Sequence, residues 1–332
     1  MEPSADGSAS DRRTRHAVRR LEFDVDWPPG HVAAYLVEGE ESVLVDAGTH
    51  EAHGADELRS GLAAHGYEPA DVAHVVVTHP HVDHIGQVPA LLDAADPTLY
   101  APAGVRERFT RDVDEHAATV RRNGREAGLD GDHLDEAVEW VVANERRDRD
   151  LLSVDDVDVW VEDGERLTVG DLTLEPVHAP GHQADHLCYG ATLGGDRVLF
   201  AGDMAIRPFR PVALHDGFGD GVRDAIPAFY DALDRLDEEA VDRVFPGHGP
   251  VHDEYADAID HSRRSLDRLL DDAHARLGDG VSTAVELAFH RSDDPTRARY
   301  MLPEAASALY HLEATGRATS YLDDGVRQYD PQ

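Results

Sequence analysis

Four side chains that could bind metal lie within six positions of this sequence, in the motif His79-x-His81-x-Asp83-His84. The motif directly follows an apolar run at residues 73–78 that is typical of a buried strand. The four side chains are therefore expected in a loop at the end of that strand. Imidazole and carboxylate groups suit Zn²⁺, and to some degree Mn²⁺ or Fe²⁺. Because four such residues cannot all surround one tetrahedral ion, the motif predicts two adjacent ions.

Three later residues extend this set, and each follows a strand of its own. His182 and His248 both occur in a Pro-Gly-His context, and Asp203 occurs in Ala-Gly-Asp. A ligand at a strand end has a rigid backbone and a side chain that is open to solvent. With 21 histidines in the chain, any one of these sites alone could be an ordinary turn. All of them in order, each after its strand, favour a metal site.

Alternating apolar runs and helical patterns must position these residues. Helices are expected at about residues 54–65, 85–92 and 225–236. Strands are expected at residues 31–37, 42–46, 73–78, 98–101, 157–161, 166–169, 172–177, 186–193, 197–200 and 243–245. A charged, helix-prone segment at about residues 105–150 interrupts this order, and we interpret it as an insertion of two long helices broken at residues 128–131.

The sequence changes in character again from about Tyr255. Helical patterns at residues 261–277, 282–289 and 303–315 precede a hairpin with a turn at residues 323–325. Three helices and a hairpin in this order are typical of a winged-helix module. The alternative is an appendage that packs against the active site or forms a homodimer. The domain limits are then a disordered tail at 1–20, a main domain at 21–254 and this region at 255–332.

The order His-x-His-x-Asp-His, Gly-His, Gly-Asp, Gly-His resembles the metallo-β-lactamase superfamily over about residues 21–251. The resemblance implies an α/β fold, an αββα sandwich with the metal site at one edge of its two sheets. It implies two Zn²⁺, with Mn²⁺ or Fe²⁺ as alternatives. The implied ligands are His79, His81 and His182 for the first metal, Asp83, His84 and His248 for the second, and Asp203 as the bridge.

Asp46 matches the early Asp of that superfamily, which orients a ligand by hydrogen bonding. An Asp at the exit of a strand is the alternative interpretation. The loop after Asp203 contains Arg207 and Arg210, which could hold a substrate carboxylate or phosphate. Alternatively, these arginines form surface salt bridges. The helical insertion, which contains Arg121 among other arginines, could form a lid or a solvated face.

Two neighbouring metals would make a bridging water into a nucleophile near neutral pH, with Asp83 accepting a hydrogen bond from it. The favoured substrate is a thioester or ester, because the chain resembles hydroxyacylglutathione hydrolases. The glutathione-binding region of those enzymes is not recognisable. Alternatives are an endoribonuclease or phosphodiesterase, and an iron persulfide dioxygenase that would use His79, His182 and Asp203. The complete ligand set argues against a non-enzymatic winged-helix binding protein.

The charge of the chain is strongly negative, with 67 acidic residues against 31 basic ones, all of them Arg. Acidic residues spread along the whole chain are typical of a halophilic protein from a salt-rich cytoplasm. Such a field favours a small-molecule substrate over nucleic acid. Cys188 is the only cysteine, so neither an intramolecular disulfide nor a thiolate cluster can form. No apolar run is as long as a membrane span, and we expect a cytoplasmic protein.

Overall fold

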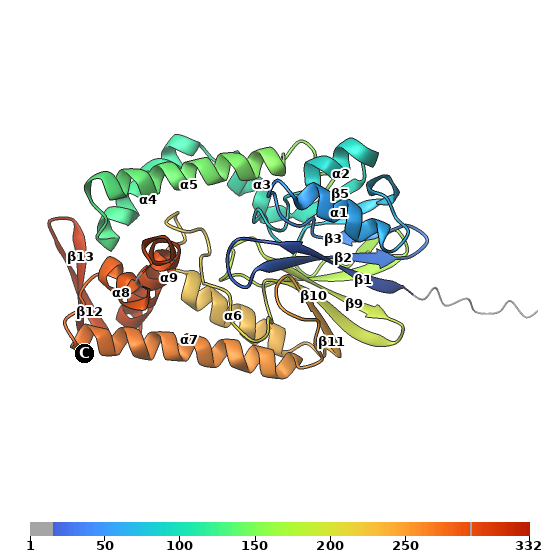
Figure 1. Ribbon diagram of the computed structural model, residues 1–332. Coiled ribbons are helices and arrows are strands. Elements are labelled where there is room, and N and C mark those ends of the chain that lie inside the picture. Colours follow the sequence, from blue (N-terminus) through green and yellow to red (C-terminus); the bar gives the residue numbers. More distant parts are fainter. Residues whose placement is uncertain (1–15, 293) are drawn as a thin grey trace, which may run out of the picture.

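The computed structural model describes residues 16–292 and 294–332 (Figure 1). Its first sheet has six strands in the order of the chain: β1 (Ala17–Asp24), β2 (His31–Glu38), β3 (Val43–Val45), β4 (His74–Val76), β5 (Thr98–Pro102) and β6 (Val159–Val161). The predicted tail 1–20 therefore ends earlier than expected, because its last four residues belong to β1. Residues 1–15 of that tail lie outside the described residues.

The second sheet has five strands in the order β11-β10-β9-β8-β7. Their bounds are β7 (Leu167–Val169), β8 (Leu172–His178), β9 (Leu187–Leu193), β10 (Asp196–Gly202) and β11 (Arg243–Pro246). Aromatic side chains fill the space between the sheets, where Phe200 stacks on Phe245 and Tyr35 meets Phe245 edge-on, each with ring centroids 5.2 Å apart. Because both faces of the sheets are covered, strands such as β2 are nearly continuous apolar runs.

Helices cover the outer face of each sheet. The first sheet packs against α1 (Gly54–Ala63), α2 (Val88–Ala95) and α3 (Ala103–Thr110) through a cluster of buried apolar side chains. The second sheet packs against α6 (Ala225–Asp237) through another. These four layers confirm the predicted αββα sandwich.

The segment predicted as a helical insertion contains the two expected long helices and, before them, most of the short α3. The long helices α4 (Val113–Ala127) and α5 (Gly131–Leu151) follow the short α3 and lie along one side of the molecule (Figure 1). Asp112 caps α4, because its side chain accepts hydrogen bonds from the backbone N–H groups of residues 114 and 115. Gly128 ends α4 in the left-handed conformation, at the break that the sequence predicted.

The C-terminal region contains three helices and a hairpin in the predicted order: α7 (Tyr255–Gly278), α8 (Ala284–Arg291), α9 (Pro295–Ala314), β12 (Ala318–Asp323) and β13 (Val326–Pro331). Helix α9 begins well before residue 303, where the sequence analysis placed its start. Asp294 caps it by accepting hydrogen bonds from the backbone N–H groups of Thr296 and Arg297, and Pro303 lies inside it. The function of this region as a winged helix stays a prediction.

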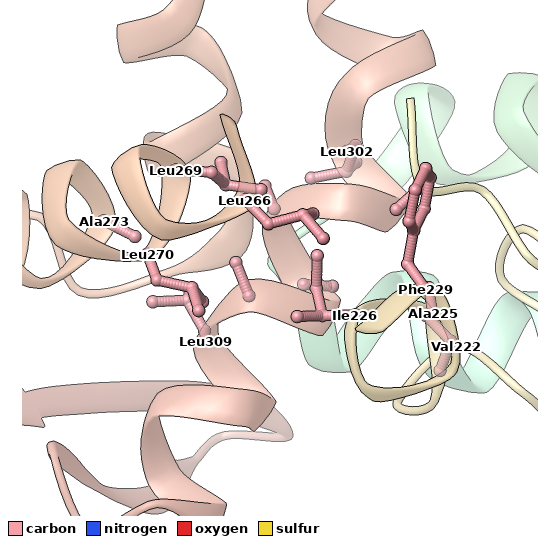
Figure 2. Packing of buried hydrophobic residues seen from close by; sticks show 14 of the residues in the cluster. Val222, Ala225, Ile226, Phe229, Leu266, Leu269, Leu270, Ala273, Leu302 and Leu309 are labelled. Atoms are coloured by element: carbon pink, nitrogen blue, oxygen red, sulfur yellow. The ribbon is translucent and has the colours of Figure 1, made fainter. Parts of the chain in front are cut away.

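The apolar core does not break at the predicted boundary near residue 255. Side chains of α6, α7 and α9 interdigitate, including Phe229, Leu266 and Leu302 (Figure 2). The same cluster of buried residues reaches Cys188 and Leu199 in the second sheet. The C-terminal helices therefore share a core with the sandwich. Among the described residues, no helix is both long and apolar enough to cross a membrane.

Candidate metal centre

The seven predicted ligands meet at one edge of the two sheets. Strands β3 and β4 are parallel, as are β10 and β11, so their carboxyl ends lie on the same side. The ligands fall into two groups, and within each group the potential donor atoms lie within 4.8 Å of one another. The first group is His79, His81, His182 and Asp203. The second is Asp83, His84 and His248. The structure thus brings together every ligand residue that the sequence predicted.

In the first group, three imidazoles and one carboxylate converge. Nδ1 of His81 lies 3.1 Å from Nε2 of His79 and 3.1 Å from Nε2 of His182. Oδ2 of Asp203 lies 3.2 Å from Nε2 of His182. Two ligand atoms of a tetrahedral zinc, each at about 2.1 Å from the ion, are roughly 3.4 Å apart. The separations in this group are therefore those of a ligand set around a single ion.

In the second group, the other oxygen of Asp203 completes the set. Its Oδ1 lies 3.2 Å from Nε2 of His84 and 3.6 Å from Nε2 of His248. Nε2 of His248 lies 3.3 Å from Oδ2 of Asp83. The two oxygens of Asp203 thus face the two groups, as a bridging carboxylate would.

Two buried polar atoms at this point have no hydrogen-bond partner among the described residues: Nε2 of His84 and Oδ1 of Asp203. Leaving such atoms unpaired is costly unless another group binds them. A divalent cation would satisfy both, and His and Asp are ligands that such a cation accepts. The residues present therefore fit a pair of divalent metal ions.

The ring nitrogens that face away from the centre have partners of their own. Nδ1–H of His79 donates to Oγ1 of Thr78 (3.0 Å) and that of His182 donates to the carbonyl of Val212 (2.9 Å). Nδ1–H of His248 donates to the carbonyl of His31 (2.7 Å). These contacts fix the tautomer, so that an unprotonated Nε2 faces the centre.

Asp46 lies where the sequence analysis expected it, behind a ligand. Its Oδ2 accepts a hydrogen bond from Nδ1 of His84 at 2.8 Å. The same carboxylate accepts hydrogen bonds from the backbone N–H and the hydroxyl of Thr78, at 2.8 and 2.9 Å. Asp46 therefore ties the strand end after β3 to the strand end after β4.

The glycines that precede two ligands leave room for the centre. A Cβ on Gly247 would lie 2.5 Å from Cε1 of His84 and 2.8 Å from Oδ1 of Asp203. A Cβ on Gly202 would lie 2.6 Å from Nε2 of His186, and Gly202 has a positive φ of 50°. The Gly-Asp and Gly-His pairs of the sequence thus reflect close approach of the backbone to these side chains.

Two side chains next to the centre, His186 and Gln183, were not predicted from the sequence. Nε2 of His186 accepts a hydrogen bond from the backbone N–H of Asp203 at 3.0 Å, in the buried interior. The side-chain amide of Gln183 lies 3.1 Å from Nε2 of His81. His186 follows His182 by four positions, and this spacing was the signal in the sequence, because neither His186 nor Gln183 directly follows the carboxyl end of a strand as the predicted ligands do.

Burial and charge set the protonation of the ligands. Burial, followed by the neighbouring imidazoles, lowers the pKa of His79 and of His81 well below the usual value. Burial would raise the pKa of Asp203, but His248 and His84 hold it well below its usual range. Burial would lower the pKa of His84 and of His248, but the neighbouring carboxylates, Asp203 first, raise it. Because metal binds the neutral imidazole and the ionised carboxylate, binding at His84 and His248 would release protons.

The two arginines predicted to bind substrate have different surroundings. The guanidinium of Arg210 is 5% exposed and pairs with Glu304 at 2.8 Å, as in the salt-bridge alternative, so its charge is already neutralised inside the protein. Arg207 is more exposed and lies 3.6 Å from Glu254, and its role in binding substrate stays a prediction. Arg121 of the insertion pairs with Asp135 at the surface.

Comparison with known proteins agrees with this geometry. The chain is 25% identical over 226 residues to the beta-lactamase-like protein 2 homolog of Caenorhabditis elegans, covering 68% of this chain and 58% of that protein. It is 22% identical over 218 residues to an atrochrysone carboxyl ACP thioesterase of a Cryptosporiopsis species, covering 65% and 48%. The chain thus spans about half the length of these curated relatives.

A solved structure shares the fold over almost the whole chain. It is the crystal structure of a metallo-beta-lactamase family protein from Thermus thermophilus, with a TM-score of 0.77 and 21% identity, covering 95% of this chain and 98% of that one. The shared fold therefore includes the C-terminal region. The family model for the metallo-beta-lactamase superfamily matches residues 27–248. This chain belongs to the metallo-beta-lactamase superfamily.

Proposed function

We propose that this protein is a binuclear metal-dependent hydrolase that cleaves a thioester or ester of a small molecule. The observation that supports it most is the placement of Asp203, whose Oδ2 lies 3.2 Å from Nε2 of His182 and whose Oδ1 lies 3.2 Å from Nε2 of His84. A carboxylate shared between two ligand groups is suited to two ions held side by side. Zn²⁺ is the metal we expect, with Mn²⁺ or Fe²⁺ as alternatives.

As the superfamily implies, His79, His81 and His182 would hold the first ion, Asp83, His84 and His248 would hold the second, and Asp203 would be shared by both. Bound metal ions would supply Lewis-acid activation of a water and of the scissile carbonyl. The carboxylate of Asp83 accepts a hydrogen bond from the attacking water and so orients it.

The chain's one thiol has no part in this chemistry. Cys188 lies in β9, is fully buried in the core, and its Sγ–H donates to the carbonyl of Ala201. Burial raises the pKa of the Cys188 thiol, which disfavours the thiolate that a nucleophile needs. A water-based attack is therefore the better model.

The thioester is favoured over other substrates by relatives named atrochrysone carboxyl ACP thioesterase, a name that gives a carrier-bound acyl group as their substrate. From this name we infer for this chain only the type of bond that is cleaved, a thioester. A nucleic-acid substrate is disfavoured by the net charge of −36. It is also disfavoured by α9, whose residues 302–309 are all buried and so could not enter a DNA groove. We propose that the C-terminal region instead supports the metal centre.

The test is hydrolysis of a panel of acyl thioesters and esters, with a bis-aryl phosphodiester as comparison. Protein stripped with a chelator should be inactive, and Zn²⁺ should restore thioester hydrolysis. His81→Ala should lower kcat by about a thousandfold or more, since it removes a donor from the first group. His53→Ala is the matched control, because His53 is an exposed histidine at the N-terminus of α1. Near-normal turnover by His81→Ala would refute the proposal.

A further inference from the structure

One peptide group lies between a candidate ligand and a buried carboxylate. The carbonyl of Val212 accepts a hydrogen bond from Nδ1–H of His182 at 2.9 Å. The N–H of the same peptide group, which belongs to Ala213, donates to Oε1 of Glu304 at 2.8 Å. Because a peptide group is planar and conjugated, its two ends are rigidly and electronically connected. Glu304 and His182 are thus separated by a single rigid group, although they are far apart in the sequence.

Glu304 is ionised in this position. It lies in α9 and is fully buried, with Arg210 at 2.8 Å from Oε1 and Arg291 at 2.8 Å from Oε2. Burial alone would raise the pKa of Glu304, but the two guanidinium groups and the Ala213 N–H lower it to about 2. The carboxylate that contacts the peptide group therefore carries a full negative charge at neutral pH.

We propose that Glu304 is a positioning residue for His182, acting through the peptide group of Val212 and Ala213. This inference rests on the proposed function, since it assumes that His182 binds metal. It assigns the C-terminal region a role in the metal centre, because Glu304 and Arg291 belong to α9 and α8.

The physical reason is polarisation along the hydrogen-bonded chain. A carboxylate that accepts the N–H of a peptide group makes the carbonyl of that group a stronger acceptor. A stronger acceptor at Nδ1–H holds the imidazole of His182 in one tautomer and makes Nε2 a better donor to metal. Asp46 does the same for His84 by direct contact, at 2.8 Å. Glu304 would act on His182 indirectly, through one peptide group.

The loop that contains this peptide group has other anchors. The backbone N–H of His215 donates to the carbonyls of Gly181 and His182, each at 3.0 Å. Asp216 pairs with Arg111 of the insertion at 2.7 Å. A change at Glu304 should therefore leave the loop attached to the segment around His182, which makes a folded variant attainable.

The test compares metal affinity in wild type and Glu304→Gln, by competition of Co²⁺ or Zn²⁺ with a chromogenic chelator. Glutamine retains an acceptor oxygen but not the charge. We expect affinity at one of the two ions to fall by about tenfold, with a shift in the visible spectrum of bound Co²⁺. Glu304→Asp retains the charge on a shorter side chain, so its metal affinity should lie between that of wild type and that of Glu304→Gln. It also serves if Glu304→Gln does not fold.

Ser307→Ala is the matched control. Ser307 lies one turn along α9, is fully buried, and accepts a hydrogen bond from the backbone N–H of Ile226 at 3.0 Å, at the start of α6 and not at the Val212–Ala213 peptide group. It should lower stability without changing metal affinity. If Glu304→Gln binds metal as tightly as wild type, or Ser307→Ala weakens binding equally, the inference is wrong and the proposed function stands. Wild type that binds no metal would overturn both.

Discussion

Oδ2 of Asp46 lies 2.8 Å from Nδ1 of His84, and both side chains are buried at the end of a strand. The contact leaves Nε2 of His84 free to face Oδ1 of Asp203. Asp46 has a positive φ of 61°, a strained conformation for a non-glycine residue that persists only where its surroundings hold it. The carboxylate of Asp46 makes three hydrogen bonds to His84 and Thr78, and these stabilise the backbone of Asp46 in this conformation.

Asp46→Asn should weaken metal binding while the fold persists. The amide is the same size as the carboxylate but lacks its charge, so it holds the imidazolyl N–H of His84 less strongly. We expect metal affinity to fall by about 10–100-fold, measured by chelator competition. Circular dichroism serves to check that the variant is folded. Unchanged affinity in a folded Asp46→Asn would contradict a role for Asp46 in orienting His84.

The charge of Glu304 should appear in the pH dependence of stability. Its pKa is about 2 in the folded protein against a usual value of 4.5, so it stabilises the fold fully above pH 4.5. That contribution is lost as pH falls from 4.5 toward 2. The difference in unfolding free energy between wild type and Glu304→Gln, from urea titrations, should shrink by roughly 1.4 kcal/mol per pH unit in this window. A constant difference would show that Glu304 is not held ionised by its arginine partners.

The two arginines of the loop after Asp203 should differ in what they contribute. Arg210→Met leaves the buried charge of Glu304 with Arg291 alone, and should cost on the order of 3 kcal/mol in unfolding free energy. Arg207→Met removes only a partly exposed pair with Glu254, and should cost less than about 1 kcal/mol. Urea titrations of both variants give the comparison. Equal losses would contradict the burial of the Arg210 ion pair.

Cys188 should be unreactive in the folded protein. Burial raises the pKa of its thiol, and the side chain has no exposed surface. A thiol reagent such as dithiobis(nitrobenzoic acid) should modify it only slowly in buffer and completely in denaturant. Rapid modification of native protein would mean that β9 is not in the core as described.

The ligand set could be predicted from the sequence because each ligand has a local signal. His79, Asp203 and His248 all follow recognisable apolar strands, and the parallel order of strands brings their ends together. The glycines that directly precede Asp203 and His248 were a second local signal. The αββα sandwich was expected from the family resemblance that this ordered ligand set carries.

The surroundings of the ligands could not be predicted, because their contacts are distant in sequence. Glu304 contacts Ala213 across 91 positions, and nothing local to α9 indicates that its carboxylate is buried beside Arg210. Pro303 misled the prediction in another way, since proline usually marks a helix start and here lies inside one. Strand β1 was missed because charged residues, among them Arg19 and Arg20, interrupt its apolar positions and an Arg-rich segment precedes it.

Asp203 is proposed to bridge two ions, and the metal content of the purified protein tests this bridge. Elemental analysis of protein purified without added metal should find about two equivalents of Zn²⁺, Mn²⁺ or Fe²⁺ per chain. Asp203→Ala should lose both, whereas the control His53→Ala should retain them. One equivalent of iron, with oxygen consumed in the presence of a persulfide, would contradict the account and favour a mononuclear dioxygenase. Protein that neither contains nor takes up divalent metal would contradict it outright.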